Sequence, residues 1–572
     1  MNVRTLSLTK PSRMGSVHVV VVLLLASTFS SCSGPPAARP GAPDIVLIMA
    51  DDMGYSDIGA FGGEIHTPNL DRLARQGLRL SDFHNTPRCV PTRASILTGQ
   101  YPHRAGLGHM EGDWGRPGYT GDLNDETVTM AEVLRSAGYR TYMAGKWHVT
   151  RQIGVWTADS TASSKHSWPI QRGFDRFYGT IIGAGSYFDP NTLANDNTPV
   201  ATTPPGYYYT DALSDSASAF IRRHAATKSS PLFLYAAFTA PHWPLQALPE
   251  DIEKYRGRYD AGWDSLRAER YRRLVSMDLV NASWPLSPRD ESAPAWETLT
   301  DEERAWYARA MEVYAAQIDR LDQGIGKIVR ALEDTGRLDN TLIVFLSDNG
   351  ACAEVLTDEW QGAYLRRQTR QGRKVTVGNE DKSVLPGPEA TYMSYGEGWA
   401  NASNTPFRLF KHFTHEGGIS SPFIAHWPAG LSPGEWRKTQ EGAISDERSQ
   451  IIDLMATFVD VSGAPYPAEV NGTTIASMAG VSLRPVFAGD TLAQRPIFFE
   501  HEGNRAVYYG DWKLVATHGQ PWSLYRIQED WTEAHDLAST QPEKVAEMVA
   551  LYEAWASANN VLPWPVKRGI TP

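Results

Sequence analysis

The sequence predicts an α/β fold in which a large mixed, mostly parallel sheet is sandwiched by helices, with a smaller C-terminal antiparallel-sheet α+β subdomain. Short apolar, β-branched runs alternate with helical patterns through most of the 572 residues. A composition of 42% hydrophobic and 21% charged residues supplies a large core and excludes a disordered chain. Beyond residue 485 the pattern changes to short strand-like runs separated by turns, which indicates a second kind of sheet.

The strands expected in the large sheet are short runs that are apolar on both faces. Residues 45–50 (IVLIMA) form the first run, and this pattern is typical of a strand covered by helices on both sides. Further buried strands are expected at 140–143, 232–238 and 342–346.

Two helices carry recognisable start and stop signals. Thr67 and Pro68 predict the N-cap and first position of a helix that Gly77 stops. A long helix is expected to begin at Thr300, where Glu303 completes a capping box, and to end at Gly336.

The last part of the chain predicts an antiparallel meander followed by a helix. Its strands are expected at 496–500, 506–509, 512–516 and 523–525, and its amphipathic helix at 542–556. We therefore divide the chain into a catalytic domain at 44–485 and a C-terminal subdomain at 486–572.

The N-terminus has the features of an export signal. A basic start precedes the apolar run 17–29, which is shorter than a membrane span and predicts a signal peptide over residues 1–31. Ser30 and Ser31 before Cys32 resemble a bacterial lipoprotein cleavage box, so Cys32 is expected to carry the lipid and residues 32–43 to form a tether. The alternative is cleavage of a plain signal peptide near Cys32. The lipoprotein interpretation places the protein in the bacterial periplasm or at the outer membrane, with membrane contact only through the lipid anchor.

Charge and cysteine content exclude other classes of protein. The formal net charge is −11, which argues against a nucleic-acid partner, and three cysteines are too few for a disulfide framework. Besides Cys32 these are Cys89 and Cys352, and the latter is expected to be an inert buried residue.

Oxygen-bearing side chains follow two of the expected strands. Asp51 and Asp52 come directly after the first strand, and Asp348 and Asn349 come after the strand at 342–346. Open α/β sheets bind ligands at the carboxyl ends of their strands, and this oxygen set suits Ca²⁺ or Mg²⁺. The alternative is that each pair caps a helix or shapes a turn.

A cysteine and several cations complete the candidate site. Pro91 and Gly99 predict a helix that begins at Cys89, so Cys89 and Arg93 should lie together at a helix N-terminus, which binds anions. Further cationic or titratable residues lie after expected strands or in loops: Lys146, His148, His242 and Lys411. Each of these alone is better explained as a solvated Lys or an internally paired His, so the functional interpretation depends on their joint occurrence.

These runs together resemble a known family. CVPTRASILTG resembles the signature of the formylglycine-dependent sulfatases, with its C-x-P-x-R core intact. Further runs resemble blocks of the arylsulfatase branch in the same order: ADDMGYSDIGAFGG, AGKWH, FTAPHWPL, LSDNG and NTPFRLFKHFTHEGGISSPFIAHWP. GDWKLV and LYRIQEDWTEAHDLA resemble the family's C-terminal subdomain, so the resemblance covers nearly the whole mature chain and implies an alkaline-phosphatase-like fold.

The resemblance implies a nucleophile and a metal site. Cys89 matches the residue that a formylglycine-generating enzyme oxidises to formylglycine, whose hydrate supplies the attacking oxygen, and Arg93 matches the arginine that holds the hydrate. The residues that match the ligands of Ca²⁺, for which Mg²⁺ is the alternative, are Asp51, Asp52, Asp348, Asn349 and the modified Cys89.

The remaining roles concern sulfate and protons. Lys146 and Lys411 match lysines that bind sulfate, His242 matches the proton donor to the leaving alcohol, and His148 matches the base that helps expel sulfate. Such a cationic set stabilises the charge that develops during ester cleavage.

The expected activity is hydrolysis of sulfate monoesters, either aryl sulfates or sulfated sugars and steroids, to an alcohol and inorganic sulfate. The alternatives are a phosphomonoester or phosphonate-ester hydrolase on the same scaffold and a non-catalytic lipoprotein that binds sulfated glycans. Aromatic residues that could stack on the leaving group, or equally belong to the core, are Trp147, Trp243, Tyr187, Phe188 and Tyr207 to Tyr209.

Overall fold

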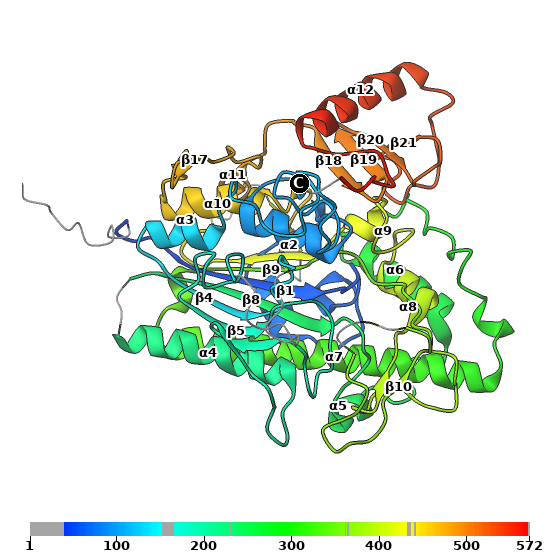
Figure 1. Cartoon of the computed structure of the whole chain (residues 1–572). Coiled ribbons are helices and arrows are strands. Elements are labelled where there is room, and N and C mark those ends of the chain that lie inside the picture. Colours follow the sequence, from blue (N-terminus) through cyan, green and yellow to red (C-terminus); the bar gives the residue numbers. More distant parts are fainter. Residues whose placement is uncertain are drawn as a thin grey trace, which may run out of the picture.

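The computed structural model of the chain describes residues 39–151, 165–227, 230–360, 362, 365–431, 436–439 and 442–569. Its centre is an 11-stranded mixed sheet in the order β13-β14-β2-β12-β9-β1-β8-β4-β5-β6-β7 (Figure 1). The five strands β9, β1, β8, β4 and β5 are parallel, and the antiparallel pairs lie toward the two edges. The strands are β1 (Asp44–Asp51), β2 (Leu78–Leu80), β4 (Arg140–Gly145), β5 (Arg176–Thr180), β6 (Leu193–Asn195), β7 (Thr198–Pro199), β8 (Leu232–Pro241), β9 (Thr341–Ser347), β12 (Phe423–His426), β13 (Arg437–Thr439) and β14 (Gly442–Ser445).

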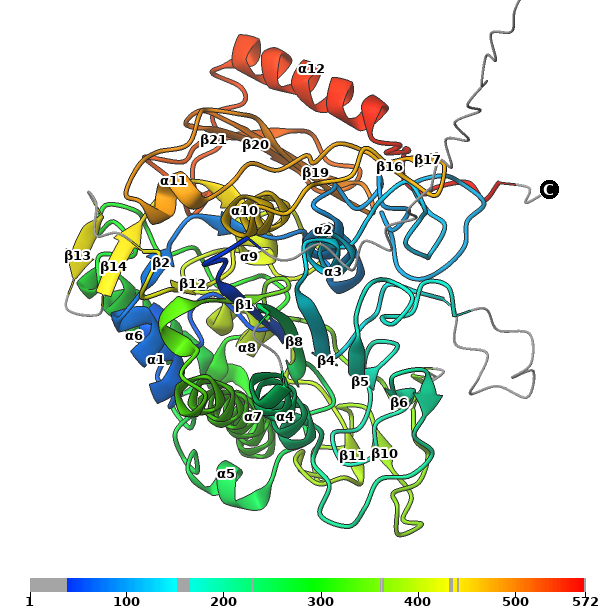
Figure 2. The ribbon, with the colours of Figure 1, turned by 90° about the vertical axis from the view of Figure 1, so that its left-hand side faces the viewer.

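Helices cover both faces of this sheet, as Figures 1 and 2 show. One face carries α1 (Pro68–Arg75), α4 (Tyr209–Thr227) and α7 (Asp301–Asp334), and the other carries α2 (Cys89–Thr98), α3 (Met130–Ser136) and α10 (Asp453–Ser462). Alternate residues of β1 enter the two cores, with Val46 and Ile48 on the α7 side and Ile45 and Leu47 on the α2 side. Burial on both faces is why this strand has no polar alternation.

Most expected elements are present. The four buried strands correspond to β1, β4, β8 and β9, and the capping box of Thr300 and Glu303 starts the 34-residue helix α7. Thr67 and Pro68 lie at the N-cap and first position of α1, as expected, although the Thr67 side chain makes no capping hydrogen bond.

The C-terminal part forms a separate four-stranded antiparallel sheet with a helix on its outer face (Figure 1). Its elements are β18 (Ile497–His501), β19 (Asn504–Tyr509), β20 (Trp512–Ala516), β21 (Ser523–Arg526) and α12 (Pro542–Ala558). Both parts of the predicted fold class are therefore confirmed.

The predicted signal peptide and Cys32 lie outside the described residues, as does most of the predicted tether. Among the residues that are described, none of the helices is both long and apolar enough to cross a membrane.

Candidate active site

The site lies at the carboxyl edge of four neighbouring parallel strands. In the sheet order β9-β1-β8-β4, each strand delivers polar residues as it ends. β9 is followed by Asp348 and Asn349, β1 ends at Asp51 with Asp52 next, His242 follows β8, and Lys146 follows β4. The parallel register aligns these ends, so residues almost 300 positions apart in sequence converge.

The oxygen donors are buried and in direct contact. The Asp52 backbone N–H donates to Asp348 Oδ1 at 3.1 Å, and Asn349 Nδ2 donates to Asp52 Oδ1 at 2.7 Å. Two other oxygens in the group, Asp51 Oδ1 and Asn349 Oδ1, are buried without a hydrogen-bond partner. Unsatisfied buried oxygens are rare because they cost free energy, and a cation is the partner that would satisfy both.

Each carboxylate is matched by a cationic side chain. Lys146 Nζ lies 2.7 Å from Asp51 Oδ2, Lys411 Nζ lies 2.9 Å from Asp52 Oδ2, and Arg93 donates to Asp348 Oδ2 at 2.9 Å. His242 Nε2 lies 3.3 Å from Asp52 Oδ2. The predicted residues of both signs thus form one buried cluster.

The pKa values of the carboxyl groups diverge. Burial raises the pKa of Asp51, but Lys146, His242 and Arg93 more than reverse this and leave the pKa below its ordinary value. Burial, reinforced by the charge of Asp51, holds the pKa of Asp348 well above its usual range. Three carboxyl groups this close cannot all ionise easily without further positive charge.

Two glycines allow this close packing. A Cβ on Gly145 would lie 1.9 Å from the carbonyl oxygen of Ala237, and Gly145 has a φ of 134°, so only glycine fits before Lys146. A Cβ on Gly350 would lie 1.8 Å from the carbonyl oxygen of Gly417, at α9 (Glu416–Ile419), so this glycine lets the segment after Lys411 approach the loop that carries Asp348 and Asn349.

Cys89 is the first residue of α2, and only 2% of it is exposed. Gly99, with a φ of 66°, ends this helix as expected. Burial raises the pKa of the Cys89 thiol, but the charges of Lys146, His148 and Lys411 lower it to about 5. The surroundings of Cys89 therefore stabilise a negative charge at this position.

The two histidines are held differently. His242 Nδ1 lies 2.6 Å from the carbonyl oxygen of Trp243, and the hydroxyl of Tyr187 donates to the His242 carbonyl at 2.9 Å, which fixes the loop. His148 Nε2 lies 3.5 Å from Glu111 Oε2. Burial lowers the pKa of His148, but Cys89 and Glu111 raise it above its ordinary value overall.

A cavity of about 390 Å³ opens onto Cys89, His148, His242 and Lys411, a volume that suits a small-molecule ligand. The cavity is also lined by charged and aromatic residues that the sequence did not predict, namely Arg88, Glu111, Glu354 and Trp360. Arg88 NH1 pairs with Glu354 Oε1 at 2.8 Å, and Glu354 Oε2 accepts from Trp243 Nε1 at 2.9 Å. Only the position of Arg88 beside Cys89 could have drawn attention to any of them.

Of the two explanations for the aromatic residues, membership of the core holds for most of them. Trp147, Tyr187, Tyr208 and Tyr209 belong to the core, with exposures of 0% to 2%. Trp243 does line the cavity, where Trp360 contacts it edge-on at a centroid distance of 5.3 Å. Cys352 is buried, as expected.

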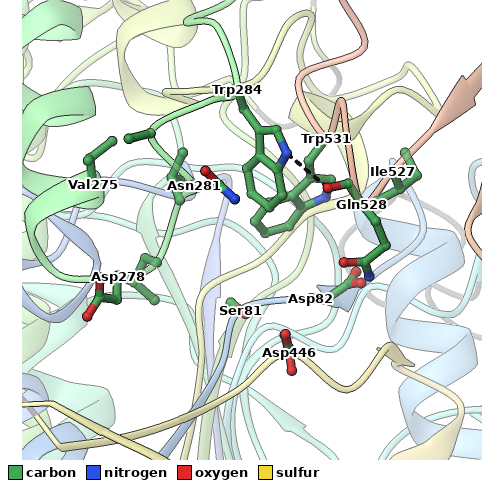
Figure 3. A pocket seen from close by; sticks show the side chains of 13 residues that line it. Ser81, Asp82, Val275, Asp278, Asn281, Trp284, Asp446, Ile527, Gln528 and Trp531 are labelled. Carbon is green, nitrogen blue, oxygen red and sulfur yellow. Dashed lines mark hydrogen bonds between the residues drawn. The ribbon is translucent and has the colours of Figure 1, made fainter.

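A second cavity, of about 410 Å³, lies where the C-terminal subdomain meets the end of α6 (Gly262–Ser276), and Figure 3 shows its lining. Trp284 Nε1 donates to the Gln528 carbonyl there at 3.2 Å, beside Trp531. None of the predicted site residues lines it, and its carboxylates, Asp82, Asp278 and Asp446, would repel an anionic substrate.

Comparison with known proteins supplies independent information. The family model described as Sulfatase matches residues 43–464. The chain is 34% identical to the arylsulfatase of Klebsiella aerogenes, over 79% of this chain and 94% of that protein. It is 33% identical to an uncharacterized sulfatase of Schizosaccharomyces pombe, over 92% of this chain and 96% of that one.

A solved structure has a similar fold. The crystal structure of Ps i-CgsB in complex with k-i-k-neocarrahexaose matches with a TM-score of 0.63 and 25% identity, over 91% of this chain and 94% of that one.

Proposed function

The chain belongs to the sulfatase family and is a sulfuric ester hydrolase, and on this premise we propose that it cleaves sulfate monoesters with a formylglycine derived from Cys89 and a bound Ca²⁺ ion. The observation that carries the proposal is that four oxygen-bearing residues converge beside a buried cysteine, which is itself surrounded by cationic side chains. Two of the oxygen atoms in this group have no hydrogen-bond partner. The maturation partner would be a formylglycine-generating enzyme.

The donor set fits a hard cation. Asp51, Asp52, Asp348 and Asn349 would hold Ca²⁺, with Mg²⁺ as the alternative, because carboxylate and amide oxygens are the ligands that these cations prefer. When bound, the ion withdraws electron density from a sulfate oxygen and neutralises the carboxylates.

Formylglycine at position 89 would supply a hydrated aldehyde as the nucleophile. Arg93, which already contacts Asp348, would hold its position, while Lys146 and Lys411 bind the sulfate oxygens. These side chains are preorganised because each is buried and fixed by a carboxylate.

Two histidines would handle the protons. His242 lies on the cavity wall, and burial lowers its pKa, so its proton would be given up readily to the leaving alkoxide. His148, on the same wall, would accept a proton as sulfate is expelled. Glu111 would keep the His148 ring oriented through its 3.5 Å contact.

The leaving group would be an aryl alcohol or a sugar. Trp243 and Trp360 provide an aromatic wall for a flat or ring-shaped group. The comparisons favour neither a phosphoester hydrolase nor a non-catalytic glycan-binding protein. Comparing the catalytic efficiencies for the sulfate and phosphate esters of one phenol would distinguish a sulfatase from a phosphoester hydrolase.

Cys89→Ala tests the nucleophile. Turnover of an aryl sulfate should fall to the limit of detection, while thermal unfolding shows that the chain remains folded. In the wild-type chain, the peptide that contains residue 89 should be lighter by about 18 Da than its cysteine form. Equal turnover by Cys89→Ala would overturn the mechanism.

The export signal and lipid anchor form a separate part of the proposal. Cys32 would be the lipidated first residue of the mature protein, and residues 32–43 would tether the enzyme to the membrane. Cys32→Ala should move the protein from the membrane fraction to the soluble fraction, and unchanged fractionation would contradict the anchor.

A further inference from the structure

Three histidines and a glutamate meet where the C-terminal hairpin touches the segment that carries Lys411. His412 follows that lysine directly, while His501 and Glu502 lie at the tip of the β18–β19 hairpin. Among the described residues, ligand atoms of His412, His501 and Glu502 all lie within 4.8 Å of one another. None of these residues has a role in the proposed sulfatase reaction.

The distances around Glu502 are those of ligands sharing an ion. Glu502 Oε2 lies 3.4 Å from His412 Nδ1, and Glu502 Oε1 lies 3.6 Å from His501 Nε2. Ligands bound to a tetrahedral zinc at its usual bond lengths stand about 3.3–3.6 Å apart. Both contacts are longer than a good hydrogen bond.

His501 is the observation that points to a ligand. Its side chain is 0% exposed, and neither ring nitrogen has a hydrogen-bond partner. Leaving a buried polar group unsatisfied costs about 1–3 kcal/mol. Coordination through Nε2 would give His501 a partner in the direction of Glu502.

The backbone presents these residues in unusual conformations. Glu502 and His412 have φ values of 51° and 92°, in a region that residues other than glycine rarely occupy. Glu502 and Gly503 form the two-residue turn of the hairpin, where Asn-Gly or Asp-Gly is the usual sequence.

A further histidine supports the carboxylate. His109 Nε2 lies 3.1 Å from Glu502 Oε1, and His109 Nδ1 accepts the backbone N–H of Met110. The proton is therefore on Nε2, the atom that faces Glu502. Metal-binding carboxylates are commonly oriented by a polar neighbour outside the ligand set.

The competing state is a metal-free hydrogen-bond network. Asn504 Nδ2 lies 3.1 Å from His412 Nε2 and can donate to it, which would leave the His412 proton on Nδ1 facing Glu502. That arrangement satisfies His412 but still leaves His501 without any partner. Asn504 Nδ2 also reaches the carbonyls of His412 and His501, so it has other acceptors when His412 binds an ion.

We propose that His412, His501 and Glu502 bind a divalent transition metal, Zn²⁺ above all, at the junction of the two parts of the chain. Two imidazoles and a carboxylate form a donor set typical of zinc, unlike the all-oxygen set near Asp51. The 33% exposure of the His412 side chain leaves the fourth position for water. The ion joins the segment after Lys411 to the hairpin, and it acts independently of the proposed sulfatase mechanism.

Zinc titration of the full-length mature protein tests this site. The parent protein is the Cys89→Ala chain, which lacks the active-site thiol. It is stripped of metal with a chelator and then saturated with Ca²⁺, which fills the proposed calcium site near Asp51. Bound Zn²⁺ is measured by equilibrium dialysis with elemental analysis, and Co²⁺ substitution reports tetrahedral geometry by its visible absorption. In this background His412→Gln and Glu502→Gln remove ligands that are partly exposed, and His518→Gln, in the loop between β20 and β21, is the matched control.

One equivalent of Zn²⁺ should bind to the parent and to His518→Gln, and each ligand variant should bind at least about 100-fold more weakly. Zn²⁺ should also raise the unfolding temperature of the parent but not that of Glu502→Gln. Equal Zn²⁺ affinity in the parent and both ligand variants would overturn the proposal. So would a folded parent that takes up no Zn²⁺, because the cluster would then be a hydrogen-bond network only. Neither result would bear on the Cys89 mechanism.

Discussion

Asn349 is the residue at which the proposed calcium ion can be tested most directly. Its Nδ2 is occupied by Asp52, while its Oδ1 has no partner in a buried site that also holds three carboxyl groups. A bound cation should therefore stabilise the fold, by about 2.7 kcal/mol at a hundred times its Kd. We expect a chelator to lower the unfolding temperature of the wild-type chain and Ca²⁺ to restore it.

Asn349→Leu should lose most of this calcium-dependent shift, because it removes one ligand and leaves the shape similar. Asn559→Leu, which deletes an amide hydrogen bond to Trp555 in the C-terminal subdomain, should keep the full shift. Thermal unfolding with and without Ca²⁺ measures both variants. Identical shifts in the two would show that Asn349 binds no cation.

At the level of residues, the sequence predicts the site side chains that lie directly after recognisable strands. Asp51, Asp348 and His242 were found because buried strands are recognisable and their carboxyl ends share one edge. Glu111, Glu354 and Trp360 lie on loops that tertiary packing brings to the cavity, and no spacing relates them to Cys89. The cluster at His501 was missed for the same reason, because His412 and His501 are neighbours only after two sheets dock.

At the level of elements, the N-terminus of α1 shows how a distant residue can supply the hydrogen-bond acceptor expected from a local capping residue. The expected cap, Thr67, is engaged with Gly59 and Asp71. Instead Asp322 of α7 accepts the backbone N–H groups of Asn69 and Leu70 at 3.1 and 2.8 Å. Local propensity thus predicts where the helix begins, but the group that satisfies its free amides comes from 250 residues away.

Asp322→Ala should destabilise the protein by about 2–4 kcal/mol, because it leaves two helix N–H groups without an acceptor. Asp322→Asn keeps one acceptor oxygen and should cost less. Denaturant unfolding at neutral pH measures both variants. An alanine variant as stable as wild type would mean that water replaces the carboxylate.

The same residue predicts a pH dependence. Burial raises the pKa of Asp322 from an ordinary 3.8 to about 6, so the folded chain takes up this proton before the unfolded chain does. The buried charge costs stability above pH 6, and this cost disappears as the pH falls toward 4. The unfolding temperature of wild type minus that of Asp322→Asn should therefore increase between pH 7 and pH 4.5. A difference that does not change with pH would contradict the assignment.

At the level of the whole molecule, the C-terminal sheet is packed between two cores. Phe499, Tyr508 and Val515 on one face join the large core on the α7 side, while Val507 and Leu514 on the other face pack on α12. The change of pattern near residue 485 therefore marks a change of sheet, and a boundary at 485/486 remains a prediction. A strand without polar residues on either face is recognisable from its sequence as covered on both sides, but its sequence does not reveal which partner covers each face.

A buried ion-pair network fixes this junction. Lys513 of β20 lies 2.7 Å from both Glu416 of α9 and Glu533, and all three side chains are 0% exposed. Glu416 also accepts from Trp531 Nε1 at 3.1 Å. Lys513→Met would leave two buried carboxyl groups without their counter-ion, which typically costs about 3–5 kcal/mol.

We expect Lys513→Met to unfold at a lower temperature in one transition, with both sheets lost together, because the network and the large core span them. Lys544→Met is the matched control, since it breaks a partly exposed pair with Glu547 and should cost at most about 1 kcal/mol. Calorimetry gives the number of transitions, and residual hydrolysis of an aryl sulfate after heating reports the catalytic sheet. If Lys513→Met instead showed a separate early transition while activity survived it, the C-terminal sheet would be an independent folding unit docked on a self-sufficient catalytic domain.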